Sequence, residues 1–259
     1  MTTIVVACKY VPDSTGDRSF EPDGTVDREA VDGLLSELDE YAVEQALQIA
    51  ENHGGEVTVL TVGPADAVDA LRKALQMGAH QAVHVTDEAI AGSDVFATSA
   101  VLAAAIGRLD ADIVLFGMAS TDGGGGVVPT LVADRLDLPA LTHASSVTVD
   151  GSTVRITRDG DTVVQQIEAS TPVVVSVTDR TDPARYPTFK GIMSAKKKTV
   201  TEWSLADLGL SADQVGLERA LTSVLDAERR PARTAGEIVT DDGDAGVKLV
   251  DFLTTHKFV

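Results

Sequence analysis

Residues 112–136, DIVLFGMASTDGGGGVVPTLVADRL, carry the clearest structural signal in the sequence, because they read as a buried strand, a glycine loop and a helix. Residues 113–116 are consecutively apolar, as in a strand covered on both faces of a parallel sheet. The four glycines at 123–126 lack β-carbons, so backbone N–H groups there can approach a ligand closely. Pro129 suits the first turn of a helix. A helix N-terminus after such a loop is a site for an anion, above all phosphate.

This glycine loop has a second interpretation, because glycine runs also form flexible linkers. The expected strand and helix on either side favour a phosphate or nucleotide loop. The sequence has neither a Walker lysine nor a G-x-G-x-x-G pattern here, so the loop alone does not identify the nucleotide.

Strands and helices alternate before this stretch. Strands are expected at 4–8, 56–62 and 81–85, and helices at 40–52, between Gly63 and Gly78, and after Ser93 or Asp94. Asp39 is a candidate cap for the helix at 40–52. The order predicts an α/β fold with a mostly parallel, doubly wound, Rossmann-like sheet. Lys9, Gly63 and Gly117 each follow a strand, so their loops are expected to meet at one rim of the sheet. The long loop at 9–25 is expected to be functional.

The pattern changes after Pro139. Short strands near 146–149, 153–156 and 162–167 are separated by Asp-Gly turn signals at 150–151 and 159–160, which predicts an antiparallel meander at 144–168. The apolar run at 172–177 indicates a return to the buried sheet. We therefore assign residues 1–178 to one nucleotide-binding domain.

Residues 179–259 are expected to form a partner-recognition loop and a C-terminal arm. Large apolar side chains cluster at Phe189, Ile192 and Met193, and helices are expected at 214–228 and 244–255. Apolar residues that lack a core of their own usually pack on another surface. We therefore expect this arm to reach a partner subunit. The alternative is a tail folded back on its own sheet.

Composition limits the classes of function. The net charge is −19 with 44% hydrophobic residues, which indicates a folded chain that works in the high-salt cytoplasm of a halophile or faces a basic partner. Nucleic-acid binding is not expected, because the only basic run is at 196–198. Cys8 is the single cysteine, as in a reducing cytosol, and is expected to be a buried hydrophobe rather than a reactive thiol. Neither a signal peptide nor a membrane span is expected.

Classical catalytic and metal motifs are not found. The five histidines show no metal-ligand spacing, so no metal site is expected. No Ser/His/Asp or Cys/His arrangement is found either. Any redox chemistry would then belong to a cofactor that the protein places and surrounds.

Several stretches together resemble the β subunit of electron-transfer flavoproteins, the EtfB/FixA family. The resemblance covers nearly the whole chain in the family's order. It is carried by VVACK at 5–9 with Pro12-Asp13, DEYAVEQA at 39–46, Gly63-Pro64 with LRKALQMGA at 71–79, the glycine loop, RYPTFKGIMSAKKK at 185–198 and RTAG at 233–236.

The resemblance implies a heterodimer with an α subunit that holds most of a shared FAD. In this chain it implies a site for AMP or, in bifurcating members, a second FAD. The implied cofactor-binding residues are Ala7, Cys8, Lys9, Ser36, Leu38, Asp39, Val62, Gly117, Met118, Ala119, Asp122, Gly123, Gly124, Gly125, Gly126, Val127 and Val128. The implied partner-docking residues are Phe189, Ile192, Met193, Lys196, Lys197 and Lys198.

The implied function is that of an electron-carrier subunit rather than a stand-alone enzyme. Flavin dehydrogenases, such as acyl-CoA dehydrogenase, would donate the electrons, and a membrane quinone oxidoreductase would receive them. Phe189 stands where family members often have leucine, and still offers a large anchor for a partner's pocket. A nucleotide-binding regulatory module of the stress-protein type remains the alternative. An adenylating enzyme is not expected, because its Ser-Gly-Gly-x-Asp-Ser loop is missing.

The nucleotide loop departs from the family pattern. Glycines 124–126, Val127, Val128 and Pro129 replace polar residues, so backbone N–H groups must contribute more of the binding. Ser36-Glu37-Leu38 replaces the family's Asn-Pro-Phe, which leaves the adenine contacts open. Lys9 is expected either to bind phosphate or to be solvated, Asp39 to bind the nucleoside or cap a helix, and Asp122 to bind ribose or shape the turn.

Overall fold

The structure is a computed structural model that describes residues 1–228, 230–232, 235–236 and 238–259. The chain divides into two compact units, Met1–Leu225 and Asp226–Val259. The first unit extends beyond residue 178, because a strand from the later segment pairs with the main sheet.

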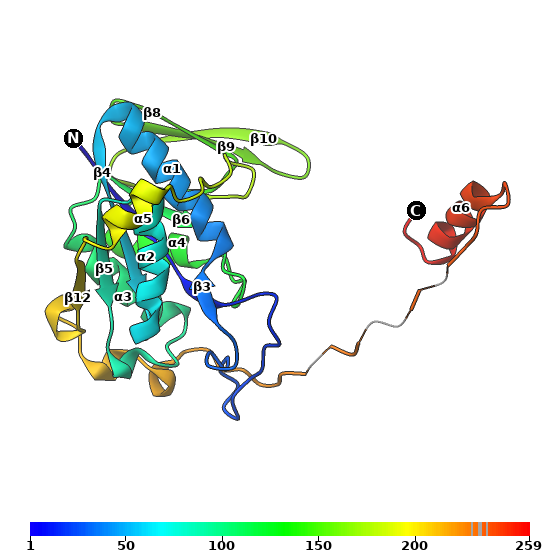
Figure 1. Cartoon of the computed structure of the whole chain (residues 1–259), viewed down its shortest axis with the longest axis horizontal. Coiled ribbons are helices and arrows are strands. Elements are labelled where there is room, and N and C mark those ends of the chain that lie inside the picture. Colours follow the sequence, from blue (N-terminus) through cyan, green and yellow to red (C-terminus); the bar gives the residue numbers. More distant parts are fainter. Residues whose placement is uncertain (229, 233–234, 237) are drawn as a thin grey trace. The chain divides into compact units, whose positions relative to one another are not determined.

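The first unit is built on a seven-stranded parallel sheet (Figure 1). Its order is β12-β5-β4-β1-β6-β11-β7. The strands are β1 (Thr2–Ala7), β4 (Gly55–Val62), β5 (Gln81–Val85), β6 (Ile113–Gly117), β7 (Ala140–Ala144), β11 (Val173–Val177) and β12 (Val200–Trp203). The predicted doubly wound α/β fold is confirmed. The edge strands β7 and β12 were not predicted.

Helices cover both faces of the sheet. Because successive residues of a strand point to opposite faces, each central strand contributes side chains to two cores. Val6 lies in one core with α1 (Glu37–His53) and α2 (Val68–Met77), whereas Val5 lies in a second core with α3 (Val95–Gly107) and α4 (Val128–Leu136). Short 3₁₀ turns, η1 (Ala65–Ala67) and η2 (Glu88–Ile90), precede α2 and α3. Asp94 caps α3 by accepting the backbone N–H groups of Phe96 and Ala97, as one of the two expected capping residues.

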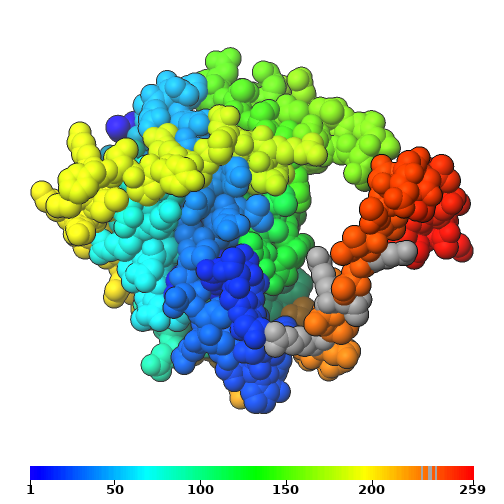
Figure 2. Space-filling view, turned by 45° about the vertical axis from the view of Figure 1, so that its right-hand side comes forward, coloured from blue at the N-terminus to red at the C-terminus, as the bar shows by residue number. Residues whose placement is uncertain are grey.

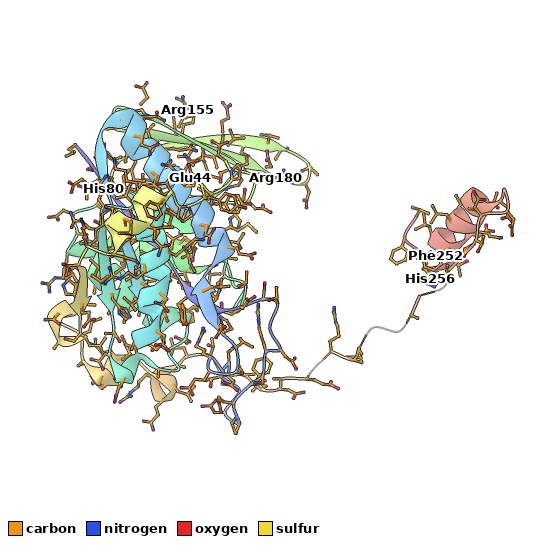
Figure 3. All side chains as sticks on the ribbon, viewed as in Figure 1. Glu44, His80, Arg155, Arg180, Phe252 and His256 are labelled. Carbon is orange, nitrogen blue, oxygen red and sulfur yellow. The ribbon has the colours of Figure 1, made fainter. Side chains whose placement is uncertain are left out.

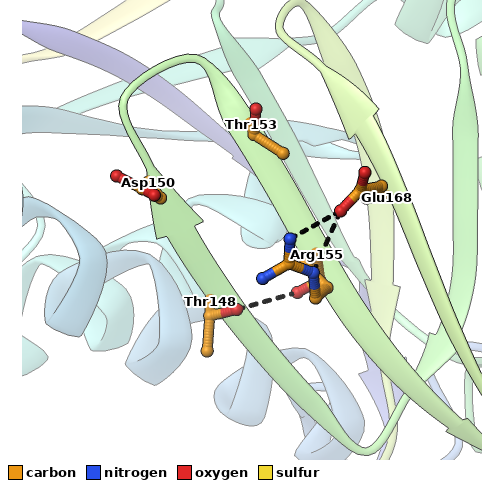
Figure 4. A pocket seen from close by; sticks show the side chains of 5 residues that line it. All are labelled: Thr148, Asp150, Thr153, Arg155 and Glu168. Atoms are coloured by element: carbon orange, nitrogen blue, oxygen red, sulfur yellow. Dashed lines mark hydrogen bonds and ion pairs between the residues drawn. The ribbon is translucent and has the colours of Figure 1, made fainter.

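The meander forms a separate sheet of three antiparallel strands. These are β8 (Ser146–Asp150), β9 (Thr153–Asp159) and β10 (Val164–Ser170). Val154 and Ile156 point into the core shared with α1 and α2. Arg155 and Glu168 form an exposed ion pair in a shallow depression on the other side, with 2.6 Å between Nη2 and Oε2 (Figure 4).

The long loop after β1 contains local structure. β2 (Tyr10–Pro12) pairs antiparallel with β3 (Gly33–Leu35), and the residues between them extend to the glycine loop through Arg18 and Arg28.

The segment after 178 begins with α5 (Phe189–Ala195), which packs on α2, and continues into β12. Figure 2 shows this segment, in yellow, lying across the surface over the blue and cyan helices. Three 3₁₀ turns follow: η3 (Ala206–Leu208), η4 (Ala212–Gln214) and η5 (Leu217–Arg219).

The helix predicted at 214–228 is wrong. Gly216 takes a positive φ of 87° between η4 and η5. Its backbone N–H bonds the Ser93 hydroxyl, and those of Leu221 and Thr222 bond the Asp94 carboxylate. These amides therefore bond the N-terminus of α3 instead of making helical hydrogen bonds.

The second unit contains the expected C-terminal helix, α6 (Ala245–Thr255). Its large apolar side chains, including Val247, Val250 and Phe252, are exposed. The Phe252 and His256 rings lie together, with 4.2 Å between their centroids (Figure 3). Among the described residues, no helix is long and apolar enough to cross a membrane.

Candidate nucleotide site at the carboxyl ends of the strands

Asp39 joins the carboxyl ends of β1 and β6. Its Oδ2 accepts the backbone N–H of Lys9 at 2.7 Å, and its Oδ1 accepts that of Gly117 at 3.1 Å. The capping role considered for Asp39 is wrong, because the N-cap of α1 is Ser36 and Asp39 lies inside the first turn. Burial raises the pKa of Asp39 to about 7, although the two N–H groups lower it. Asp39 thus fixes two loops of the rim relative to each other.

Gly117 is required for this close approach. A β-carbon there would lie 2.5 Å from Asp39 Oδ1 and 2.7 Å from the carbonyl oxygen of Leu38. The N-terminus of α1 can therefore sit against the end of β6 only when that position is glycine.

The glycine loop leads into α4 as predicted. Gly124 and Gly126 take positive φ values of 61° and 63°, and Pro129 lies in the first turn. Among the described residues, no side chain caps the N-terminus of α4. Uncapped N–H groups at the positive end of a helix dipole are suited to an anion.

Asp122 shapes the glycine loop through two ion pairs. Its Oδ1 lies 2.8 Å from Lys9 Nζ, and its Oδ2 lies 2.8 Å from Arg28 Nη2. Burial opposes ionisation of this carboxylate, which is only 2% exposed, but attraction to Lys9 and hydrogen bonds hold its pKa well below its usual range. Of the alternatives considered, Asp122 therefore has the turn-shaping contacts, and Lys9 is paired rather than freely solvated.

Two arginines that sequence reasoning missed also reach this loop. Arg28 pairs with Asp122, and Arg18 Nη1 donates to the Thr121 carbonyl at 2.9 Å. Both come from the long loop after β2. The loop at 9–25, which was expected to be functional, contains Arg18, and Arg28 lies just beyond it. Sequence spacing could not show which side chains face the rim.

The remaining predicted nucleotide residues lie around the same rim. Ala7 and Cys8 are buried at the end of β1, and Val62, Leu38, Met118 and Ala119 are half-buried. Burial raises the pKa of the Cys8 thiol well above its ordinary value, so the expectation of a buried hydrophobe holds. In the part of the chain that the structure describes, Ser36 Oγ is buried without a hydrogen-bond partner.

The predicted docking residues lie elsewhere, on and after α5. Phe189 is 79% exposed, and Met193 is partly exposed beside it. Lys196 and Lys197 are exposed, whereas Lys198 Nζ donates to the Ala79 carbonyl. Lys198 is therefore partly committed to internal structure.

A catalytic metal site is not supported by the geometry. In the described ranges, no group of three His, Cys, Asp or Glu side chains could hold a metal ion. A second depression, of about 240 Å³, lies between α1 and β8, away from the rim residues.

Comparison with known proteins assigns the family. A family model described as "Electron transfer flavoprotein domain" matches residues 23–208. The chain belongs to the electron transfer flavoprotein family. "Electron transfer flavoprotein subunit beta" of Mycobacterium leprae is 47% identical, with the whole of both chains covered. "Caffeyl-CoA reductase-Etf complex subunit CarD" of Acetobacterium woodii is 35% identical, covering 92% of this chain and 91% of its own. "Protein FixA" of Rhizobium meliloti is 38% identical, covering 80% and 74%.

These matches confirm the family that the sequence motifs indicated. The chain is a β-type subunit of an electron transfer flavoprotein, its work is electron transfer, and a flavin takes part. β subunits of this family pair with an α subunit and exchange electrons with dehydrogenases. The matches favour this function over the regulatory-module alternative. They give no support to an origin in a halophile.

Proposed function

We propose that this subunit works in the cytoplasm, receives electrons from flavin dehydrogenases such as acyl-CoA dehydrogenase, and passes them to a membrane quinone oxidoreductase. The observation that supports this most strongly is the full-length similarity to "Electron transfer flavoprotein subunit beta". The FAD shared with the α subunit would supply the redox chemistry. This chain would bind a nucleotide, close over the flavin and dock the partners.

We propose that the rim binds an adenine nucleotide, AMP. The glycine loop and the uncapped N-terminus of α4 would offer N–H groups to the phosphate. Lys9 and Arg28 place two cations beside one carboxylate, which leaves a net positive charge in a chain of net charge −19. Ser36 Oγ, buried and unpaired among the described residues, is free to bond the base or ribose.

A second FAD in place of AMP is the other candidate occupant. The similarity to a subunit of the caffeyl-CoA reductase-Etf complex favours it. The chain would then take part in electron bifurcation.

The nucleotide content of the purified heterodimer tests both proposals. One FAD and one AMP released per heterodimer would support a plain carrier, whereas two FAD and no AMP would support bifurcation. A colourless chain that never binds an α subunit would contradict the proposed function.

Phe189, Ile192 and Met193 are proposed to enter a dehydrogenase pocket, with Lys196 and Lys197 facing acidic groups of the partner. Residues 183–200 contain five basic and no acidic side chains, in contrast to the rest of this acidic chain. Such a surface is complementary to a negatively charged one.

The net charge also supports a proposal about the working medium. Self-repulsion of this size is weakened by salt, so a high-salt cytoplasm would suit the protein. Unfolding temperatures that stay constant from 0.1 to roughly 2 M KCl would speak against it.

A further inference from the structure

We propose that Arg185 is a positioning residue that holds the recognition segment, residues 186–195, ready for docking by joining it to two carboxylates of α1. The proposal rests on the proposed function, in which this segment docks a dehydrogenase. Arg185 is not itself part of the docking surface; its role is to fix that surface in place.

The contacts of Arg185 use most of its hydrogen-bonding capacity. Its Nε and Nη2 lie 2.7 and 3.0 Å from the two oxygens of Glu44, and its Nη1 and Nη2 lie 2.5 and 3.1 Å from the two oxygens of Glu51. The backbone N–H of Arg185 also donates to Glu44 at 3.1 Å. A guanidinium can bind two carboxylates in this forked way, whereas a lysine ammonium cannot.

The α1 side of this contact is rigid. Val43 and Leu47 of α1 are buried in the core beside the sheet. Glu44 belongs to the same helix (Figure 3). Glu44 is only 4% exposed, so its charge requires a partner. Burial raises its pKa, but the hydrogen bonds from Arg185 lower it below the ordinary value. Arg185 is thus fixed to a charge that has little freedom to move.

The other end of the segment is fixed to α2. Arg72 Nη1 donates to the carbonyl oxygens of Ala195 at 3.2 Å and Lys198 at 2.7 Å. A β-carbon on Gly191 would lie 2.5 Å from the Gln76 carbonyl, so α5 rests directly on α2. The segment is therefore held at both ends.

Exposed apolar side chains lie between these two attachments. Tyr186 is 92% exposed, Phe189 79% and Met193 44%. Phe189 and Met193 lie on the short helix α5, and Tyr186 lies just before it, so these exposed side chains have little packing of their own to keep them ordered. Fixing them beforehand reduces the entropy lost on binding, which improves affinity without any new contact to the partner. Arg185 therefore contributes to docking through the geometry of Phe189.

The test uses the heterodimer as an electron acceptor for a flavin dehydrogenase. Glu51→Gln removes the charge and one of the two acceptor oxygens at an exposed site. Arg185→Ala combined with Glu44→Gln removes the whole contact without leaving a buried charge unpaired. Arg155→Ala is the matched control, because it breaks an exposed arginine–glutamate pair on the meander. We expect the double variant to raise the KM for the heterodimer about fivefold, equivalent to ~1 kcal/mol of binding, with kcat and flavin content unchanged.

Hydrogen exchange provides a readout that does not depend on activity. The amides of residues 186–195 should exchange faster in the double variant and at the wild-type rate in Arg155→Ala. Unchanged exchange in the double variant would overturn the proposal.

Phe189→Ala distinguishes the docking role of the segment from the positioning role of Arg185. If it raises the KM but the Arg185 variants do not, the positioning role is overturned and the docking surface stands. If Phe189→Ala leaves the KM unchanged, the docking role and the positioning role fall together, while a one-to-one complex with bound FAD would still support the electron-carrier function.

Discussion

At the residue scale, the rim depends on the absence of a β-carbon at Gly117. Gly117→Ala would place a β-carbon against Asp39 Oδ1 and the Leu38 carbonyl, both rigid neighbours at the start of α1. We expect a loss of roughly 1–3 kcal/mol in unfolding free energy, with weaker nucleotide binding. Denaturant unfolding and nucleotide titration would measure both effects. Gly107→Ala at the end of α3, outside the glycine loop, is the control, since its nearest neighbour atom would be 3.9 Å away. Equal losses in the two variants would refute the steric explanation.

Asp39 gives the rim a pH dependence. Its pKa is about 7 in the folded chain because of burial, against about 3.9 when unfolded. Between these values the folded state keeps a proton that the unfolded state releases, so this group's contribution to stability falls as pH rises. The slope reaches about 1.4 kcal/mol per pH unit for one proton. Unfolding free energies at pH 5, 6 and 7 should show a smaller slope in Asp39→Asn, and parallel curves would contradict the assignment.

Residue types at the rim were predictable, but their contacts were not. Lys9, Asp39 and Asp122 were identified from motifs, and each lies at the end of the strands. Their partners come from segments far away in sequence, as with the 113 positions between Lys9 and Asp122. Arg28 was missed because nothing in a coil sequence sets the direction of one side chain.

At the level of elements, Asp94 holds two segments at once. Its Oδ1 caps α3, and its Oδ2 accepts the backbone N–H groups of Leu221 and Thr222. Asp94→Ala should cost about 1–2 kcal/mol through the lost cap alone and should also release the segment around 221. Thermal unfolding and hydrogen exchange at 216–225 would detect the two effects. Asp87→Ala, which removes only the cap of η2, should leave that exchange unchanged.

The buried central strands were the most predictable elements. β1, β6 and β11 contain short apolar runs, as expected for strands of a parallel sheet with two covered faces, and β5 has the predicted bounds, 81–85. The edge strands β7 and β12 are partly exposed and polar, so no such run marks them. The spacing at 217, 221 and 224 mimics a helix, but hydrogen bonds to Ser93 and Asp94 override it. The helical spacing gave a wrong prediction here because the backbone N–H groups bond the side chains of Ser93 and Asp94 instead of helix carbonyls.

At the scale of the whole molecule, the proposed nucleotide site and the proposed docking surface lie in different parts of the fold. The proposed nucleotide-binding residues lie at the ends of β1, β4 and β6, whereas the recognition segment packs on α1 and α2 through Arg185 and Arg72. Substitutions in one place should therefore leave the other function measurable. That independence is what allows docking and nucleotide content to be tested separately.

The unit Asp226–Val259 is expected to bind the α subunit. α6 exposes Val247, Leu249, Val250 and Phe252, a set of apolar groups larger than an isolated helix of 11 residues can bury. Because Met1–Leu225 forms a compact unit with its own cores, a chain ending at Leu225 should still fold, with a circular dichroism spectrum that lacks only the contribution of the removed residues, α6 among them. Its affinity for the α subunit should fall at least tenfold, by more than ~1.4 kcal/mol.

Val250→Asp in the full chain would show whether the apolar face of α6, rather than the length of the arm, produces this loss. Lys257→Ala, at an exposed position after the helix, is its control. Co-purification with the α subunit and the FAD bound per complex are the two measurements. If Val250→Asp binds as tightly as Lys257→Ala, the apolar face of α6 does not contribute to binding the α subunit. Reduced binding in Val250→Asp alone would mean that α6 obtains from the α subunit the apolar contacts that it lacks within its own unit.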